Sequence, residues 1–185
     1  MTQPTTPPTT ADLIKRLIRD IPDFPKPGIV FKDITPLLAD AAAFRALIEA
    51  LVAPYRGRVD AVLGIESRGF IIGAAAALAL GTGIAIVRKP GKLPFHTHRA
   101  SYELEYGSDT LEIHEDAVGK GHRVLLIDDL LATGGTASAA IQLVGRCGGI
   151  VTACAFVIEL AFLGGRKRLA PHEVHSLVSY DGEGS

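Results

Sequence analysis

Sulfur-containing and indole side chains are nearly missing: the 185 residues include two cysteines, one methionine and no tryptophan. Cys147 and Cys154 fit neither a C-x-x-C motif nor a zinc-ligand spacing, which argues against a disulfide-linked or zinc-bound fold. The longest apolar stretch, residues 70–80, is much shorter than the roughly 20 residues that span a bilayer. The sequence therefore predicts a reduced, cytoplasmic protein with no membrane partner.

A surplus of charge is also lacking, because the formal net charge is only −1. This argues against a nucleic-acid or membrane partner held by bulk electrostatics, and the basic run at residues 166–168 is typical of a solvated surface. Residues 1–10 are rich in Thr and Pro without an apolar segment, which predicts a disordered tail instead of a signal peptide. Residues 11–185 are enough for one domain with a full hydrophobic core.

The central feature is a predicted strand, loop and helix at residues 124–144. Four β-forming residues lead into Asp128 and Asp129, a loop with Gly134 and Gly135 follows, and the apolar residues after it recur at helical spacing. An apolar run without alternation is typical of a parallel strand covered on both faces. This segment is therefore interpreted as half of a βαβ unit, with the acid pair at the end of its strand.

The loop after this strand suits a sugar phosphate. Backbone amides and hydroxyl groups of residues 132–136 would lie at a helix N-terminus, which favours an anion, and glycine lets the backbone approach it closely. Asp128 and Asp129 would repel a phosphate but accept hydrogen bonds from hydroxyl groups, so a ribose 5-phosphate fits both ends. The loop lacks the Lys of a nucleotide-triphosphate P-loop, and no G-x-G-x-x-G indicates a dinucleotide site.

The remaining elements are predicted from the same kinds of pattern. Strands are expected at residues 59–65, 84–87, 110–114, 123–129, 150–160 and 174–178, and helices at residues 11–20, 41–53, 70–80 and 137–144. Residues 93–107 are polar and interrupted by Pro94 and Gly107, which predicts a mobile lid between two strands.

Five separated motifs resemble type I phosphoribosyltransferases. Residues 128–136 are similar to the family's phosphoribosyl-pyrophosphate motif, in the form carried by members that use adenine. The likeness continues at residues 24–33, 66–70, 88–94 and 104–107. The resemblance implies an α/β fold: a mostly parallel twisted sheet flanked by helices, with a flexible lid at residues 91–108 and a small N-terminal hood at residues 20–35.

The resemblance also implies a purine salvage enzyme of the cytoplasm that works as a homodimer. It would transfer the 5-phosphoribosyl group from 5-phosphoribosyl 1-pyrophosphate to N9 of adenine, giving AMP and pyrophosphate. Mg²⁺ would be held mainly by substrate and water, with no protein ligands. Two alternatives stay open: a phosphoribosyltransferase for another purine base, and a non-catalytic regulator that senses phosphoribosyl pyrophosphate. A regulator needs a DNA-binding segment, yet the roughly 20 residues before the enzyme-like region are not basic enough.

The same resemblance assigns catalytic roles to three carboxylates. Asp128 and Asp129 would orient the ribose through its hydroxyl groups, and Glu105 would be the acid/base near the imidazole ring of the purine. Lys89 would bind the diphosphate, and Arg88 would reach across the dimer interface.

The base would be held by residues 30–32. Phe31 would stack on the purine, while main-chain groups of Val30 and Lys32 would read its edge, although many relatives carry Arg at the position of Lys32. The full set implied to bind substrates is Val30, Phe31, Lys32, Arg68, Arg88, Lys89, Lys92, Tyr106, Ala132, Thr133, Gly134, Gly135 and Thr136.

Overall fold

The computed structural model describes residues 9–103 and 108–182. Contacts divide the chain into two units, Met1–Ala50 and Leu51–Ser185, each with its own internal contacts. That residues 11–185 form one domain stays a prediction. Among the described helices, none is both long and apolar enough to cross a membrane.

The N-terminal unit contains a short antiparallel hairpin and helices. Its elements are α1 (Thr10–Leu17), β1 (Arg19–Ile21), β2 (Phe31–Asp33), α2 (Thr35–Ala39) and most of α3 (Ala41–Val52). The helix predicted at residues 11–20 ends earlier, because Arg19 starts β1 and its Nη2 lies 2.6 Å from Asp33 Oδ2 across the hairpin. Thr9 and Thr10, expected in the tail, instead cap and begin α1.

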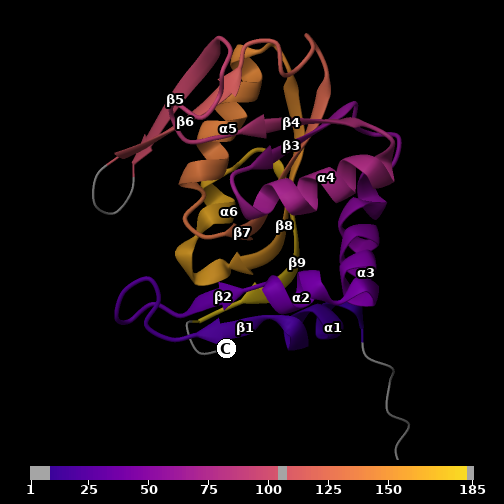
Figure 1. The fold of residues 1–185 in the computed structure, drawn as a ribbon, viewed down its shortest axis with the longest axis vertical. Helices are drawn as coiled ribbons and strands as arrows, with labels where there is room; N and C mark the ends of the chain where they lie inside the picture. The colour runs from indigo at the N-terminus through magenta and orange to yellow at the C-terminus, as the bar shows by residue number, and fades with distance from the viewer. Residues whose placement is uncertain (1–8, 104–107, 183–185) are drawn as a thin grey trace, which may run out of the picture. The chain divides into compact units, whose positions relative to one another are not determined.

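The second unit is built on a five-stranded, all-parallel sheet in the order β4-β3-β7-β8-β9 (Figure 1). Its strands are β3 (Ala61–Ile65), β4 (Gly83–Val87), β7 (Arg123–Leu131), β8 (Ile150–Leu160) and β9 (Glu173–Tyr180). Its helices are α4 (Arg68–Leu80), α5 (Gly135–Arg146) and α6 (Gly165–Arg168), with single 3₁₀ turns at Ala53–Tyr55 and Ala161–Leu163. The parallel sheet flanked by helices confirms the predicted fold class.

The connections leave the middle of this sheet in opposite directions. β3 connects through α4 to β4 on one side, and β7 connects through α5 to β8 on the other. Because such crossovers are right-handed, α4 and α5 cover opposite faces of the sheet. Ligands of open α/β sheets bind outside the carboxyl ends of the strands where the order reverses, which here is between β3 and β7.

The two strands at this reversal are apolar and buried. All five residues of β3 are buried, as is β7 from Val124 to Ile127, in keeping with their unbroken apolar runs. α4 packs closely on β7 because Gly69 has no side chain: a Cβ there would lie 2.9 Å from Asp128 Oδ1 and 3.0 Å from the carbonyl oxygen of Ile127. Gly69 thus allows the first turn of α4 to lie directly against the acid pair.

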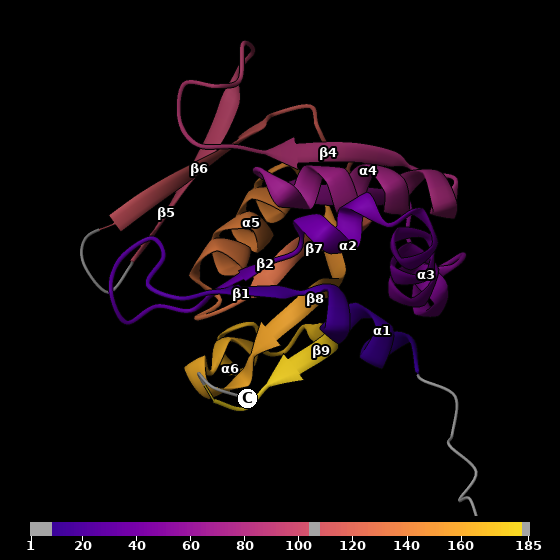
Figure 2. The ribbon, with the colours of Figure 1, turned by 60° about the horizontal axis from the view of Figure 1, so that its bottom comes forward.

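Much of the segment expected to be a lid is a hairpin. β5 (Thr97–Glu103) and β6 (Ser108–His114) pair in antiparallel fashion and lie alongside α5 (Figure 2). Residues 97–103, which sequence patterns assign to a lid between strands, are therefore a strand themselves. Ala100 and Tyr102 are buried at alternate positions, a period of two that their polar neighbours hide. Residues 104–107, the remainder of the expected lid, lie outside the described residues.

Candidate active site

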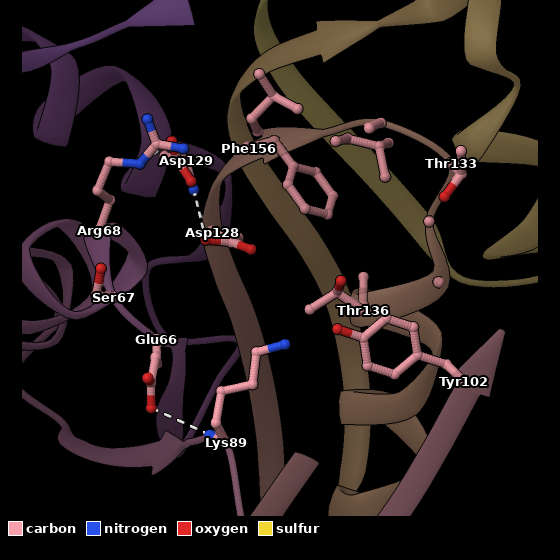
Figure 3. A pocket seen from close by; sticks show the side chains of 16 residues that line it. Glu66, Ser67, Arg68, Lys89, Tyr102, Asp128, Asp129, Thr133, Thr136 and Phe156 are labelled. Atoms are coloured by element: carbon pink, nitrogen blue, oxygen red, sulfur yellow. Dashed lines mark hydrogen bonds and ion pairs between the residues drawn. The ribbon is translucent and has the colours of Figure 1, made fainter. Parts of the chain in front are cut away.

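A cavity of about 400 Å³ lies at the carboxyl ends of the central strands (Figure 3). Three segments contribute to it, namely the residues that follow β3, a residue after the end of β4, and the end of β7 with the residues after it; β5 and β8 each add a single residue. The lining residues are Glu66, Ser67, Arg68, Lys89, Tyr102, Asp128, Asp129, Leu130, Leu131, Ala132, Thr133, Gly134, Gly135, Thr136, Ala137 and Phe156. The cavity thus occupies the position at which the strand order reverses.

Only three residues, 132–134, join β7 to α5. β7 runs to Leu131, two residues beyond the prediction, because its last residues keep pairing with the longer β8. Gly134 precedes the helix with a φ of 79°, a conformation in which other residues meet a Cβ clash. Since glycine has no side chain to cap a helix, the first amides of α5 remain available to an anion in the cavity.

The two members of the acid pair have different surroundings. Successive side chains of a strand point to opposite faces, so Asp128 points into the cavity while Asp129 turns toward Arg68 of α4 (Figure 3). Asp129 is only 5% exposed, and its Oδ2 lies 2.8 Å from Arg68 Nε. The carboxylate of Asp128 accepts a hydrogen bond from the backbone N–H of Asp129 at 2.9 Å.

Burial raises the pKa of both carboxyl groups. For Asp128 the pKa is raised well above its usual value, because the charge of Asp129 adds to the effect of burial. For Asp129, burial raises the pKa against the opposing effect of the Arg68 guanidinium. Arg68 therefore keeps Asp129 closer to its ionised form, and Asp128 becomes the more readily protonated of the two.

Glu66 interacts with the basic residues that follow β4. It accepts hydrogen bonds from Arg88 Nε at 3.0 Å and from the backbone N–H of Lys89 at 3.1 Å, and it pairs with Lys92. Burial raises the pKa of Glu66, but the hydrogen bonds from Lys92, Lys89 and Arg88 outweigh burial and leave the pKa lowered. The peptide bond between Glu66 and Ser67 is cis.

The hairpin of β5 and β6 holds the turn at residues 88–92, which contains these cations and is called the basic turn below. Glu112 of β6 is 1% exposed, accepts a hydrogen bond from the Gly91 N–H at 3.0 Å and has Oε1 2.7 Å from Arg99 Nε. Lys89, which lines the cavity, pairs with Asp109 at the start of β6. Acidic residues of β6 thus hold both the backbone and a side chain of the basic turn.

The cavity brings together most of the residues predicted to bind a sugar phosphate. Predicted residues in its lining are Arg68, Lys89, Asp128, Asp129, Ala132, Thr133, Gly134, Gly135 and Thr136. Arg88 and Lys92 are held by Glu66 and are not part of the lining. Residues 30–32 belong to the N-terminal unit, and Glu105 and Tyr106 lie outside the described residues.

Within the N-terminal unit, the residues predicted to hold a base have partners of their own. Phe31 packs edge-on against Phe24, with ring centroids 5.2 Å apart. The Lys32 side chain is 3% exposed, and its Nζ lies 2.9 Å from Asp20 Oδ1. The cation of Lys32 is thus neutralised inside the hairpin of β1 and β2.

No role is predicted from the sequence for four polar or aromatic lining residues: Glu66 and Ser67, which lie in the motif at residues 66–70, and Tyr102 and Phe156. Glu66 and Ser67 directly follow β3, and their position at the carboxyl end of a parallel strand was the available signal. Phe156 reaches the cavity because it is the register partner of Asp128. Tyr102 reaches the cavity from β5, which is paired with β6. Neither the pairing of β5 with β6 nor that of β7 with β8 can be predicted from local sequence patterns.

Comparisons with known proteins agree on one family. A profile of the phosphoribosyl transferase domain matches residues 32–180. Adenine phosphoribosyltransferase of Solibacter usitatus is 60% identical over 169 residues, which cover 91% of this chain and 98% of that protein. The crystal structure of adenine phosphoribosyltransferase from Rhodothermus marinus gives a TM-score of 0.89 at 53% identity, with 92% of this chain and 98% of that chain covered. The protein of the same name from Saccharomyces cerevisiae, solved with an imino-altritol bisphosphate and adenine, gives a TM-score of 0.87 at 40% identity, with 91% and 98% covered.

Replacement of Arg68 by glutamine tests the electrostatics of the acid pair. We expect Arg68→Gln to raise the pKa of Asp129, because a neutral amide no longer stabilises the charged carboxylate. Carbon-13 NMR titration of labelled aspartate carboxyl groups measures the change. Arg123→Gln is the control: Arg123 pairs with Asp60 at 2.8 Å and holds the pKa of Asp60 low, so this variant should shift Asp60 and leave Asp129 unchanged. An Asp129 titration that is the same with and without Arg68 would contradict the assignment.

Proposed function

The chain belongs to the phosphoribosyl transferase family, and we propose that it is a purine salvage enzyme that makes AMP and pyrophosphate from adenine and 5-phosphoribosyl 1-pyrophosphate. The observation that carries this function is one shared cavity, which is lined by Asp128 and by the loop of residues 132–136. Adenine is the proposed base because a relative named adenine phosphoribosyltransferase is 60% identical across 91% of the chain.

The sugar phosphate is held at both ends. Amides and hydroxyl groups of residues 132–136 bind the 5′-phosphate at the N-terminus of α5. The carboxylates of Asp128 and Asp129 accept hydrogen bonds from the 2′- and 3′-hydroxyl groups and orient the ring. Their negative charge also stabilises the positive charge that develops at C1′ when the bond to pyrophosphate breaks.

The diphosphate is bound by cations on the opposite side of the acid pair. Lys89 and Arg68 line the cavity, and Arg88 and Lys92 lie next to it on Glu66. In the described parts of the chain, no three His, Cys, Asp or Glu side chains group so as to hold a metal ion. The phosphate and hydroxyl oxygens of the substrates suit Mg²⁺, which would be held mainly by substrate and water and would supply positive charge to neutralise the leaving diphosphate.

The base is selected by main-chain polarity. A C=O and an N–H of Val30 and Lys32 match the N6 donor and N1 acceptor of adenine, and the engaged side chain of Lys32 supports a main-chain role. Phe31 supplies an aromatic face for stacking. A 6-oxopurine has the opposite polarity at this edge and leaves buried groups unpaired, which disfavours it by roughly 10⁴-fold in a site built for the donor–acceptor pair.

The reaction exchanges one bond at C1′ for another. The C1′–O bond breaks first and its electron pair leaves with pyrophosphate, after which N9 of adenine bonds to C1′ from the opposite face. Glu105 accepts the proton that the imidazole ring loses, and Tyr106 helps to exclude water, which would otherwise hydrolyse the cation. Homodimerisation, action of Arg88 across the interface and a cytoplasmic location stay predictions from the family resemblance.

The assay that tests this function mixes the purified chain with phosphoribosyl pyrophosphate, Mg²⁺ and equal amounts of adenine, hypoxanthine, guanine and xanthine. AMP should be the dominant nucleotide, with pyrophosphate released in equal amount, because the other bases mismatch the main-chain pair. Chromatography of the products with pyrophosphate detection makes the measurement. IMP, GMP or XMP as the main product would assign another base, and no nucleotide at all would point to a ligand-sensing regulator.

Neutralising the acid pair should abolish most of the activity. The double change Asp128→Asn and Asp129→Asn should lower kcat by about 100-fold or more, because amides no longer stabilise positive charge at C1′. Steady-state kinetics, with circular dichroism to verify folding, makes the comparison. Asp60→Asn is the control, since Asp60 pairs with Arg123 outside the cavity and should keep kcat within about twofold. Near-normal turnover in the double variant would remove the ribose-binding role.

Changing Glu105 separates catalysis from binding. Glu105→Gln should lower kcat by about 100-fold while changing the KM for adenine much less, because an amide keeps the shape but cannot accept the proton. Glu115→Gln serves as the control, since Glu115 is exposed and directly follows β6. A change confined to KM would make Glu105 a binding residue only.

A further inference from the structure

The turn that follows β8 lies against the loop that follows β7. Because β7 and β8 are neighbours in the sheet and end in register, with Leu131 beside Glu159, the segments after them meet at the same edge. Gly165, the first residue of α6, is buried there. Residues 164–168 are called the buttress turn below.

The contact between the two segments leaves no room for a side chain. A Cβ atom on Gly165 would overlap the carbonyl oxygen of Ala132 and lie 3.0 Å from Leu131 Cδ1. From the other side, a Cβ atom on Gly134 would lie 2.8 Å from the carbonyl oxygen of Gly165. Gly134 and Gly165 therefore allow the backbone of the buttress turn to pack directly on the backbone of the loop at residues 132–134.

A charged pair fixes the buttress turn to the sheet. Arg166 donates from Nε and Nη2 to the two carboxylate oxygens of Glu159, at 3.0 and 2.5 Å. It also donates to the carbonyl oxygen of Val174 at 2.6 Å and to Ser176 Oγ at 3.1 Å, both on β9. The same Ser176 hydroxyl donates to Glu159 at 2.6 Å.

This network is well suited to hold the buttress turn in a fixed position on the sheet. Glu159 is 5% exposed, and the hydrogen bonds from Arg166 lower its pKa, so the pair stays charged at neutral pH. A bidentate guanidinium–carboxylate pair sets orientation as well as distance. Arg166 lies in the basic run that sequence patterns assign to a solvated surface. Its side chain is 49% exposed, while its guanidinium group is directed at β8 and β9.

We propose that the buttress turn sets the shape of the 5′-phosphate loop, with Gly165 and Arg166 as positioning residues for phosphate affinity. The inference rests on the proposed function, which assigns the 5′-phosphate to residues 132–136. The amides of a helix N-terminus bind an anion well only when they converge on it. A displacement of about 1 Å at such a site can cost on the order of 100-fold, and a methyl group on Gly165 forces a shift of that size on Ala132.

The test compares ligands that differ in which end of the site they occupy. Gly165→Ala should weaken binding of ribose 5-phosphate by about 10- to 100-fold, measured by isothermal titration calorimetry. Binding of Mg²⁺-pyrophosphate should stay within about twofold, because its proposed ligands follow β3 and β4. In steady-state kinetics, the KM for phosphoribosyl pyrophosphate should rise while the KM for adenine does not. Gly145→Ala is the matched control: it adds the same methyl group to α5, where a Cβ would meet no atom within 4 Å.

A second variant keeps the proposal testable if Gly165→Ala does not fold. Arg166→Lys retains the positive charge but loses the bidentate pair, so it should weaken ribose 5-phosphate binding by about 3- to 10-fold, again without a change for pyrophosphate. Unchanged affinity for ribose 5-phosphate in the folded variants, or an equal loss for both ligands, would overturn the proposal. A wild-type chain that makes no AMP would refute the proposed function, whereas the ribose 5-phosphate comparison would still decide the role of the buttress turn.

Discussion

The close approach of α4 to the carboxyl end of β7 is the constraint on which the cavity depends. A buried carboxylate is unfavourable unless a counter-charge and hydrogen bonds compensate for lost water. Gly69 allows the helix to reach the strand, and Arg68, one residue earlier, then lies against Asp129. The same contact that packs the core therefore delivers the cation that makes an acid pair tolerable at the end of an apolar strand.

Apart from Asp128, the charged residues predicted to bind ligand in and beside the cavity have protein counter-charges among the described residues. Asp129 has Arg68, Lys89 has Asp109, and the other cations of the basic turn share Glu66. Binding of the diphosphate under the proposed function would therefore replace existing ion pairs with new ones. The net gain would come from better geometry and the higher charge of the ligand, since the cations are already paired with carboxylates before it arrives.

Local sequence patterns predict those features that depend only on residues close together in the chain. The apolar runs of β3 and β8, the acid pair and the glycine loop follow from residue type and spacing alone, and the structure brings most of the predicted phosphate-binding residues to one cavity. The extra length of β7 depends on its partner β8, and the strand at residues 97–103 depends on pairing with β6. The fit of Gly165 against Ala132 joins segments far apart in the chain, so no neighbouring residue could signal it.

The three-residue link between β7 and α5 ties the length of the binding loop to the orientation of the helix. Each residue of an α-helix turns it by about 100°, so inserting or deleting one residue among 132–134 would rotate the face of α5 that contains Ala140, Leu143 and Val144 away from the sheet. Evolution can therefore vary the chemistry of this loop by exchanging side chains, but not by changing its length. Insertions and deletions in this lineage should be found in connections that do not lead directly into a packed helix.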